Sequence, residues 1–233
     1  LLVNVICASL LVYCLYKFLL ELPRPWLGLI VAIPYFIIVI SMGFVRQGIA
    51  IALFMYAISF IKTQKYKSYI FWTFIASTFH ISALAFLPLI LFQYLQKKIL
   101  STFFIFTIVI IVFYLNLDLI SSKAEDYILT EMISEGALIR SIMNLIPAII
   151  FIIYINKFRI EKSEKYFWLQ MSTISIIFSL ILILFPNYTV IDRLGFYLIA
   201  LQMFVFTFLP GVFGVYYKKN KFWVIVIIIY YFL

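Results

Sequence analysis

The sequence predicts an all-α, polytopic helical membrane protein. Of its 233 residues, 67% are hydrophobic and only 12% are charged, whereas a soluble domain is nearer half apolar and a quarter charged. The apolar residues form long runs separated by short, Lys-rich loops, as in helical membrane proteins. The short alternating segments of a membrane β-barrel are absent. The net charge of +9 comes largely from loops beside the apolar runs, which argues against a nucleic-acid partner.

Nine apolar runs are candidate membrane spans. Most have about the 17–25 residues that a spanning helix needs, but the fourth is long and the last is short. The runs are 1–20, 26–42, 43–61, 69–95, 99–117, 137–155, 167–185, 193–216 and 222–233. We expect one transmembrane domain over 1–233. Because the sequence lacks an initial Met and a signal-peptide pattern, we expect further spans to precede it.

The distribution of positive charge indicates that the long run at 69–95 is broken or re-entrant. Cytoplasmic loops are enriched in Lys and Arg, and lysines flank this run on both sides. Both clusters lie inside if the chain turns back near His80. Of the 18 Lys and Arg residues, the outer side then holds only these: Arg46, Lys123, Arg140 and Arg193. Most acidic residues fall outside, chiefly in a polar outer loop at 118–136.

Four cationic or titratable side chains should therefore lie near the outer surface: Arg46, His80, Arg140 and Arg193. An ionisable group at membrane depth costs several kcal/mol unless it has a partner or lines a wet cavity. Four such groups at one level predict a cavity that holds an anion. His, Cys, Asp and Glu show no metal-binding spacing, so we expect neither a metal nor another cofactor.

The first candidate site is the Arg46-Gln47 pair, which lies between Gly43 and Gly48 at the start of the third run. A helix start with a guanidinium group is suited to phosphate or pyrophosphate. The alternative is an arginine that extends to the lipid headgroups. His80, the only histidine, could be a general base or acid, or it could simply be hydrogen-bonded by a neighbouring helix.

The second candidate site opens the eighth run. Arg193 and Tyr197 are four residues apart and would share a helix face, so Arg193 could bind an anion that Tyr197 orients. Alternatively, Asp192 caps the helix and Arg193 pairs with it. Arg140 is the arginine that best fits a headgroup contact, because it begins the sixth run.

These segments together resemble the EpsG family, which is allied to the Wzy-type polysaccharide and O-antigen polymerases. The resemblance covers roughly 40–200 and rests on three elements in order. They are the glycine-bracketed Arg-Gln pair, Phe-His-Ile-Ser at 79–82, and Asp192-Arg193-Leu194 with Tyr197. It implies a GT-C-like bundle in the bacterial cytoplasmic (inner) membrane. The implied enzyme joins oligosaccharide repeat units, carried on undecaprenyl pyrophosphate, at the outer face.

The resemblance implies roles for the candidate residues. Those expected to bind pyrophosphate are Arg46, Gln47, Arg193, Arg140 and Tyr197. His80 would be the general base on the acceptor hydroxyl or a leaving-group contact, and Asp192 is the second candidate base. The loop at 118–136 would select sugars. Expected partners are the lipid-linked oligosaccharide, membrane lipid and a chain-length regulator protein.

Two other functional classes fit the same charges. A transporter or flippase of lipid-linked oligosaccharide also needs cations in a membrane cavity, although the sequence has no inverted repeat. Another membrane transferase, such as an O-antigen ligase or O-acyltransferase, could share an outer Arg/His site. Whether the product is capsule, exopolysaccharide or O-antigen stays open.

Overall fold

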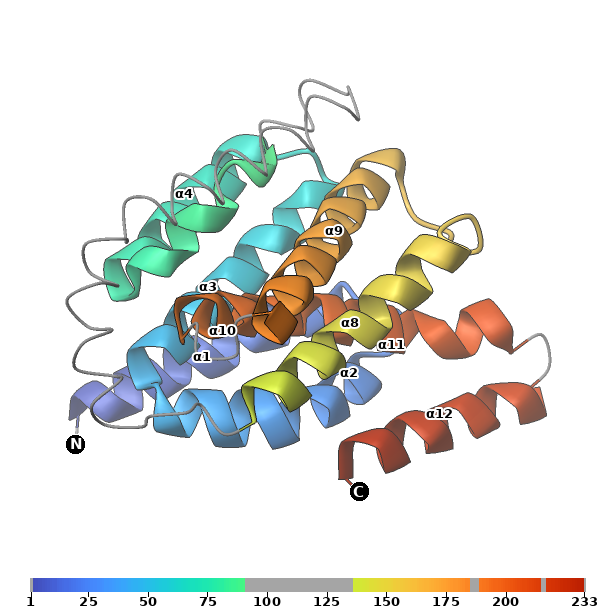
Figure 1. Ribbon diagram of the computed structural model, residues 1–233. Helices are drawn as coiled ribbons and strands as arrows, with labels where there is room; N and C mark the ends of the chain where they lie inside the picture. Colours follow the sequence, from blue (N-terminus) through green and yellow to red (C-terminus); the bar gives the residue numbers. More distant parts are fainter. Residues whose placement is uncertain (1, 91–135, 185–188, 215–216, 233) are drawn as a thin grey trace.

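The computed structural model describes residues 2–90, 136–184, 189–214 and 217–232, and these parts are helical (Figure 1). The N-terminal helices are α1 (Leu2–Leu20), α2 (Pro25–Ala32), η1 (Ile33–Ser41), α3 (Val45–Lys62), α4 (Tyr66–Phe79) and η2 (Ile81–Phe86). The C-terminal helices are α8 (Ala137–Tyr154), α9 (Lys162–Leu184), α10 (Thr189–Gly195), η3 (Phe196–Leu198), α11 (Ile199–Phe213) and α12 (Tyr217–Phe232). The predicted all-α class is confirmed, whereas the run at 99–117 and the loop at 118–136, apart from Gly136, lie outside the described residues.

Among the described residues, four helices are long and apolar enough to cross a membrane. They are Val45–Lys62, Ala137–Tyr154, Lys162–Leu184 and Val190–Phe213. Three shorter apolar helices accompany them: Asn4–Leu20, Pro25–Ser41 and Asn220–Phe232. Their boundaries follow local chemistry. For example, Pro25 occupies the first turn of α2, where its missing N–H is not needed, and Gly136 precedes α8 with a φ of 90°.

The break predicted near His80 is confirmed. The His80 backbone is extended, with φ −152° and ψ 119°, and it separates α4 from η2. The hydroxyl of Tyr69, near the start of α4, donates a hydrogen bond to the Phe86 carbonyl at 2.7 Å. In a continuous helix these residues would be about 25 Å apart, at 1.5 Å per residue. The chain therefore reverses between them, and its return into the membrane stays a prediction.

The helices run back and forth between two ends of the bundle (Figure 1). At one end Lys62 pairs with Glu21 at 3.6 Å, and Glu164 lies within electrostatic range of Lys62 and Glu161. We call this the lysine-rich end. It contains loops that the charge pattern predicts to be cytoplasmic. The opposite end, which we call the site end, contains the start of α3, the His80 turn and α10.

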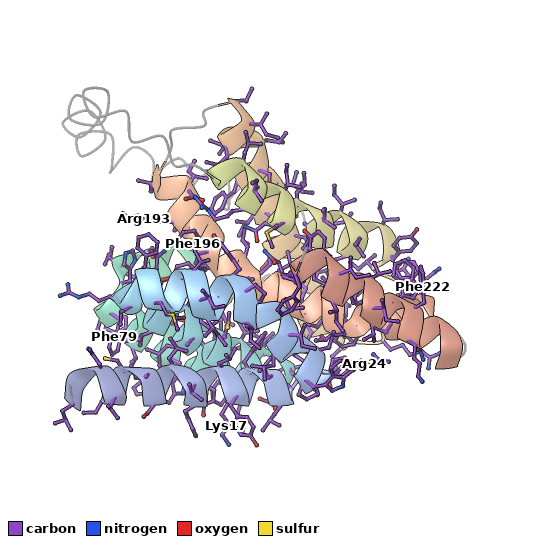
Figure 2. All side chains as sticks on the ribbon, turned by 90° about the horizontal axis from the view of Figure 1, so that it is seen from below. Lys17, Arg24, Phe79, Arg193, Phe196 and Phe222 are labelled. Atoms are coloured by element: carbon purple, nitrogen blue, oxygen red, sulfur yellow. The ribbon has the colours of Figure 1, made fainter. Side chains whose placement is uncertain are left out.

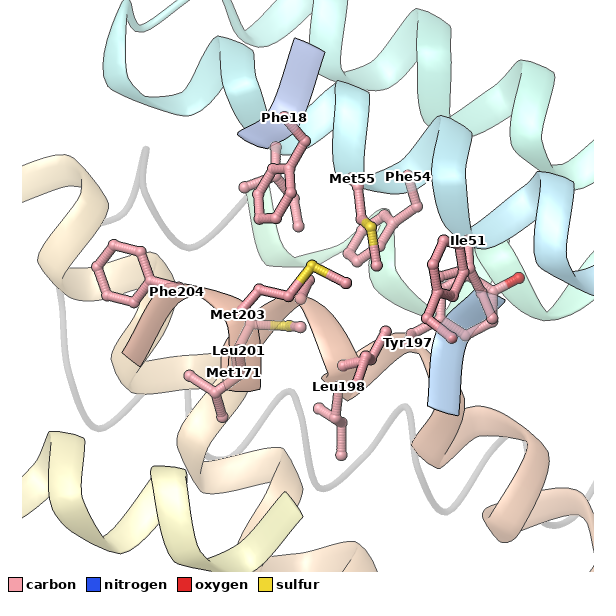
Figure 3. Packing of buried hydrophobic residues seen from close by; sticks show 14 of the residues in the cluster. Phe18, Ile51, Phe54, Met55, Met171, Tyr197, Leu198, Leu201, Met203 and Phe204 are labelled. Carbon is pink, nitrogen blue, oxygen red and sulfur yellow. The ribbon is translucent and has the colours of Figure 1, made fainter. Parts of the chain in front are cut away.

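The core lies between α3 and the η3–α11 segment. Figure 3 shows Phe54 and Met55 of α3 in one cluster with Tyr197, Leu201 and Met203. Of the four candidate spans, Val45–Lys62 and Val190–Phe213 have the largest buried shares. Arg46 and Arg193 therefore lie near the starts of the two most enclosed spans, which supply a rigid support.

Candidate functional site

The Arg46-Gln47 pair lies at the first turn of α3, where the two side chains have different environments. Gln47 is buried, and its Nε2 donates a hydrogen bond to the Arg193 carbonyl at 2.7 Å. This bond joins the start of α3 to α10, although the residues are 146 positions apart. Arg46 is exposed, and within the described residues its guanidinium has neither a hydrogen bond nor an ion pair. The predicted anion-binding arginine is thus available to a ligand.

Two aromatic rings connect the arginines of the site end. The Arg193 guanidinium carbon lies 5.8 Å from the ring centre of Phe44, and that of Arg140 lies 5.8 Å from the ring centre of Phe196. The two rings are themselves 5.9 Å apart. Cation–π attraction of this kind contributes roughly 0.5–2 kcal/mol. Each ring therefore helps to orient the guanidinium group beside it.

Arg140 and Asp192 form a bidentate ion pair between α8 and α10. Arg140 Nε donates to Asp192 Oδ1 at 2.9 Å, and its Nη2 donates to Oδ2 at 2.7 Å. Both side chains are largely enclosed, at 19% and 7% exposed. The carboxylate therefore pairs with an arginine on another helix. The alternative in which Asp192 pairs with its neighbour Arg193 is wrong. Arg193 is exposed and has no ion pair in the described part of the chain.

His80 belongs to a hydrogen-bonded chain of three side chains. Its Nδ1 lies 2.5 Å from Ser82 Oγ, and Ser82 Oγ donates to the Tyr197 hydroxyl at 3.0 Å. The Arg193 guanidinium is close enough to act electrostatically on the half-buried imidazole. Tyr197 has no exposed surface. It therefore lies behind His80, where its hydroxyl supports Ser82 and does not face solvent.

A second polar layer lies deeper in the bundle. Asn144 Nδ2 donates to the Gly195 carbonyl at 3.1 Å and its Oδ1 accepts from Gln202 Nε2 at 2.6 Å. Gln202 Oε1 in turn accepts from the Tyr231 hydroxyl at 2.5 Å. The layer borders a small pocket lined in part by Arg140, Ser141, Asn144, Ser175, Ser179 and Asp192. These amides were not among the residues predicted from the sequence, although polar residues inside apolar spans are a signal for them.

The structure brings all seven predicted site residues to the site end. Figure 2 places Arg193, Phe196 and Phe79 on one side of the molecule, away from Arg24 and Phe222. Arg46 and Arg193 present exposed charge, and Gln47, Asp192 and Tyr197 are buried supports. Ser82 joins the site although it was noted only as part of the Phe-His-Ile-Ser element. Within the described residues, no group of three His, Cys, Asp or Glu side chains could hold a metal ion.

Comparison with known proteins gives one clear match. The model of the EpsG family matches residues 1–233, the whole chain. No curated protein matches, and no solved structure does. The resemblance inferred from the motifs is therefore confirmed. This polytopic helical chain belongs to the EpsG family, whose members are Wzy-type polysaccharide polymerase-like membrane proteins.

Proposed function

We propose that this protein polymerises oligosaccharide repeat units carried on undecaprenyl pyrophosphate, by metal-independent glycosyl transfer at the outer face of the bacterial cytoplasmic membrane. The family supplies the coarse class, a polysaccharide polymerase-like membrane protein. The observation that carries the finer proposal is that two exposed guanidinium groups, Arg46 and Arg193, lie at the same end of the bundle as His80, with Arg193 in electrostatic range of the imidazole. This set of groups can bind a leaving group and activate an acceptor.

A lipid-linked diphosphate fits the exposed arginines. Guanidinium groups bind phosphate oxygens through two parallel N–H donors, and the start of α3 adds backbone N–H groups of the same polarity. The site lies at a bundle end, where the headgroup of a membrane lipid would be found. Arg140 contributes less charge to a ligand, because Asp192 already neutralises it.

In the proposed glycosyl transfer, His80 and the two exposed arginines act in successive steps. His80 accepts the proton of an acceptor sugar hydroxyl, and the resulting oxygen attacks the anomeric carbon of the donor. The bond from that carbon to the pyrophosphate oxygen breaks, and its electron pair leaves with undecaprenyl pyrophosphate. Arg46 and Arg193 stabilise the charge that develops there. The imidazolium then releases its proton to water.

Asp192 is the weaker candidate for the base. Both of its carboxylate oxygens accept hydrogen bonds from Arg140 at 2.9 and 2.7 Å. The carboxylate is enclosed and directed toward Arg140, so an acceptor hydroxyl has little access to it. Its position favours a structural role, in which it fixes α10 and therefore Arg193.

The orientation of the bundle supports an outer site. Lysine-rich loops favour the cytoplasmic side, and in the described chain Lys62, Arg159 and Lys162 belong to the lysine-rich end. The site end is opposite. A donor lipid in the outer leaflet would present its diphosphate at this level.

The test is a polymerisation assay with purified protein in liposomes and one lipid-linked repeat unit. We expect dimers and longer products from the native protein, and only single repeats from Arg46→Ala, Arg193→Ala and His80→Ala. Arg159→Ala is the matched control, because it removes an exposed arginine at the opposite end. Unchanged product ladders in all three site variants would contradict the proposal. Movement of intact substrate across the bilayer without elongation would indicate a flippase, and transfer to a different acceptor would indicate a ligase.

A further inference from the structure

The pocket beside the Arg140–Asp192 pair lies between α8, α9 and α10. Serines of two helices line it: Ser141 of α8, and Ser175 and Ser179 of α9. It has room for the centre of about one water molecule. Both α8 and α9 are long and apolar enough to span a membrane. A polar surface between two such helices is costly unless its groups find hydrogen-bond partners.

Ser141 supplies a buried hydroxyl that needs such a partner. The residue is only 4% exposed, and its enclosed Oγ has no hydrogen-bond partner among the described residues. Buried polar groups are almost always bonded to protein or to ordered water, because an unmade bond costs free energy. Since Ser141 lines the pocket, a ligand bound there would provide the missing partner.

The two serines of α9 supply acceptors. Ser175 Oγ donates to the Asn144 carbonyl at 2.8 Å, and Ser179 Oγ donates to the Ser141 carbonyl at 3.2 Å. A carbonyl oxygen only accepts, so the direction of both bonds is fixed. Each hydroxyl thereby uses its single hydrogen and keeps lone pairs for an incoming donor. The pocket thus offers hydrogen-bonding groups from both helices.

The charges around the pocket favour a neutral ligand. Arg140 and Asp192 are joined as a bidentate ion pair, and the other side chains that line the pocket are neutral. An anion would therefore gain no net attraction here, unlike at Arg46 and Arg193. The pocket instead suits a molecule about the size of water that can both donate and accept hydrogen bonds.

We infer that this pocket binds an ordered water molecule, which bonds to Ser141 Oγ and bridges α8 to a serine of α9. The inference does not depend on the proposed function. Because Ser141 directly follows Arg140, the bridge would also support the turn of α8 that presents the guanidinium to Asp192. A sugar hydroxyl has the same chemistry, but a sugar ring is too large for the pocket.

The sign of a stability change tests the inference. Removing a hydroxyl that is bonded to water destabilises a protein, whereas removing an unsatisfied hydroxyl does not. We therefore expect Ser141→Ala to lower the unfolding midpoint in detergent. Ser59→Ala is the matched control, because Ser59 Oγ is also enclosed without a partner among the described residues but does not line this pocket. Its midpoint should stay the same or rise.

A second control separates the pocket from ordinary buried serines. Ser172 Oγ donates to the Trp168 carbonyl of its own helix at 2.8 Å, so Ser172→Ala should change the midpoint little. All three variants replace a helical serine by alanine, and the gain in helix propensity is therefore common to them. A midpoint for Ser141→Ala that stays level or rises, as in Ser59→Ala, would overturn the inference.

A structure of the native protein without substrate, at a resolution that shows ordered water, is the direct measurement. We expect density within hydrogen-bonding distance of Ser141 Oγ and of Ser175 or Ser179, and we expect Ser141→Ala to lose it. A dry pocket would overturn the inference. Density that is present only with the lipid-linked repeat unit would also overturn it, because the ligand would then be a sugar hydroxyl.

Discussion

Gly43 and Gly48 bracket the Arg46-Gln47 pair, yet the structure predicts opposite effects for replacing them by alanine. A Cβ atom at Gly48 would lie 2.9 Å from Ser41 Cα and 3.1 Å from Ser41 Oγ, whereas a Cβ at Gly43 would meet nothing within 4 Å. The first contact is with backbone, so the end of η1 must move away from α3. Overpacking of this kind costs about 1–3 kcal/mol.

The comparison of the two variants isolates that cost. Neither glycine has a positive φ, so both substitutions gain about 0.4–1 kcal/mol by restricting the unfolded chain. This gain largely cancels when the stabilities of the two variants are compared with each other. We therefore expect Gly48→Ala to be about 1–3 kcal/mol less stable than Gly43→Ala, measured as the free energy of unfolding in detergent. Gly48→Ala should also elongate substrate more slowly, because the Gln47 bond to Arg193 lies beside the displaced contact. Equal stability of the two variants would refute the close packing of η1 on α3.

Three further outcomes follow from the same geometry. Arg46→Lys should polymerise at least about 10-fold more slowly, since a point charge does not replace a two-donor fork; native rates would indicate general electrostatics. Asp192→Asn should lower the free energy of unfolding by about 3 kcal/mol, because it removes the carboxylate that pairs with Arg140. Adding Arg140→Gln should restore stability. If the double variant also regains polymerase activity, Asp192 is not the base. Asn144→Ala should lower the free energy of unfolding by about 1–3 kcal/mol, because it leaves its buried hydrogen-bond partners unsatisfied. The control, Asn156→Ala, changes an exposed residue and should leave stability unchanged. Equal unfolding midpoints for the two variants would contradict the polar layer.

Most of the described helices could be predicted from the sequence, because membrane spans depend on simple local patterns. Apolar length and charged loops placed α3, α8 and α9 within a few residues of their observed bounds. The break at His80 came from a different source, the positive charge on both sides of one long run. That argument is global, and the hydrogen bond between Tyr69 and Phe86 confirms the reversal it required.

Partner choice within the site could not be predicted, because it depends on tertiary packing. Sequence proximity offered Arg193 as an alternative partner for Asp192, but the carboxylate reaches Arg140 on another helix. Tyr197 also does not share a helix face with Arg193, although the sequence predicted that it would. The four-residue spacing from Arg193 assumes an α-helix, whereas η3 is a 3₁₀ turn with 3.0 residues per turn. Tyr197 is therefore buried behind His80, and its expected role in orienting an anion stays a prediction.

Within the described residues, Arg140 has an acidic partner whereas Arg46 and Arg193 have none, so this part of the site end keeps positive charge. Arg140 is neutralised by Asp192, and that pair, with the Asn144 bond to Gly195, anchors α10. The Gln47 bond to Arg193 then anchors α10 to α3 without using any guanidinium donor. Because these buried contacts hold the backbone, the guanidinium groups of Arg46 and Arg193 need no acidic partner of their own. Two such charges match a diphosphate better than a single phosphate. A site arranged in this way is preorganised for the charge that leaves during glycosyl transfer.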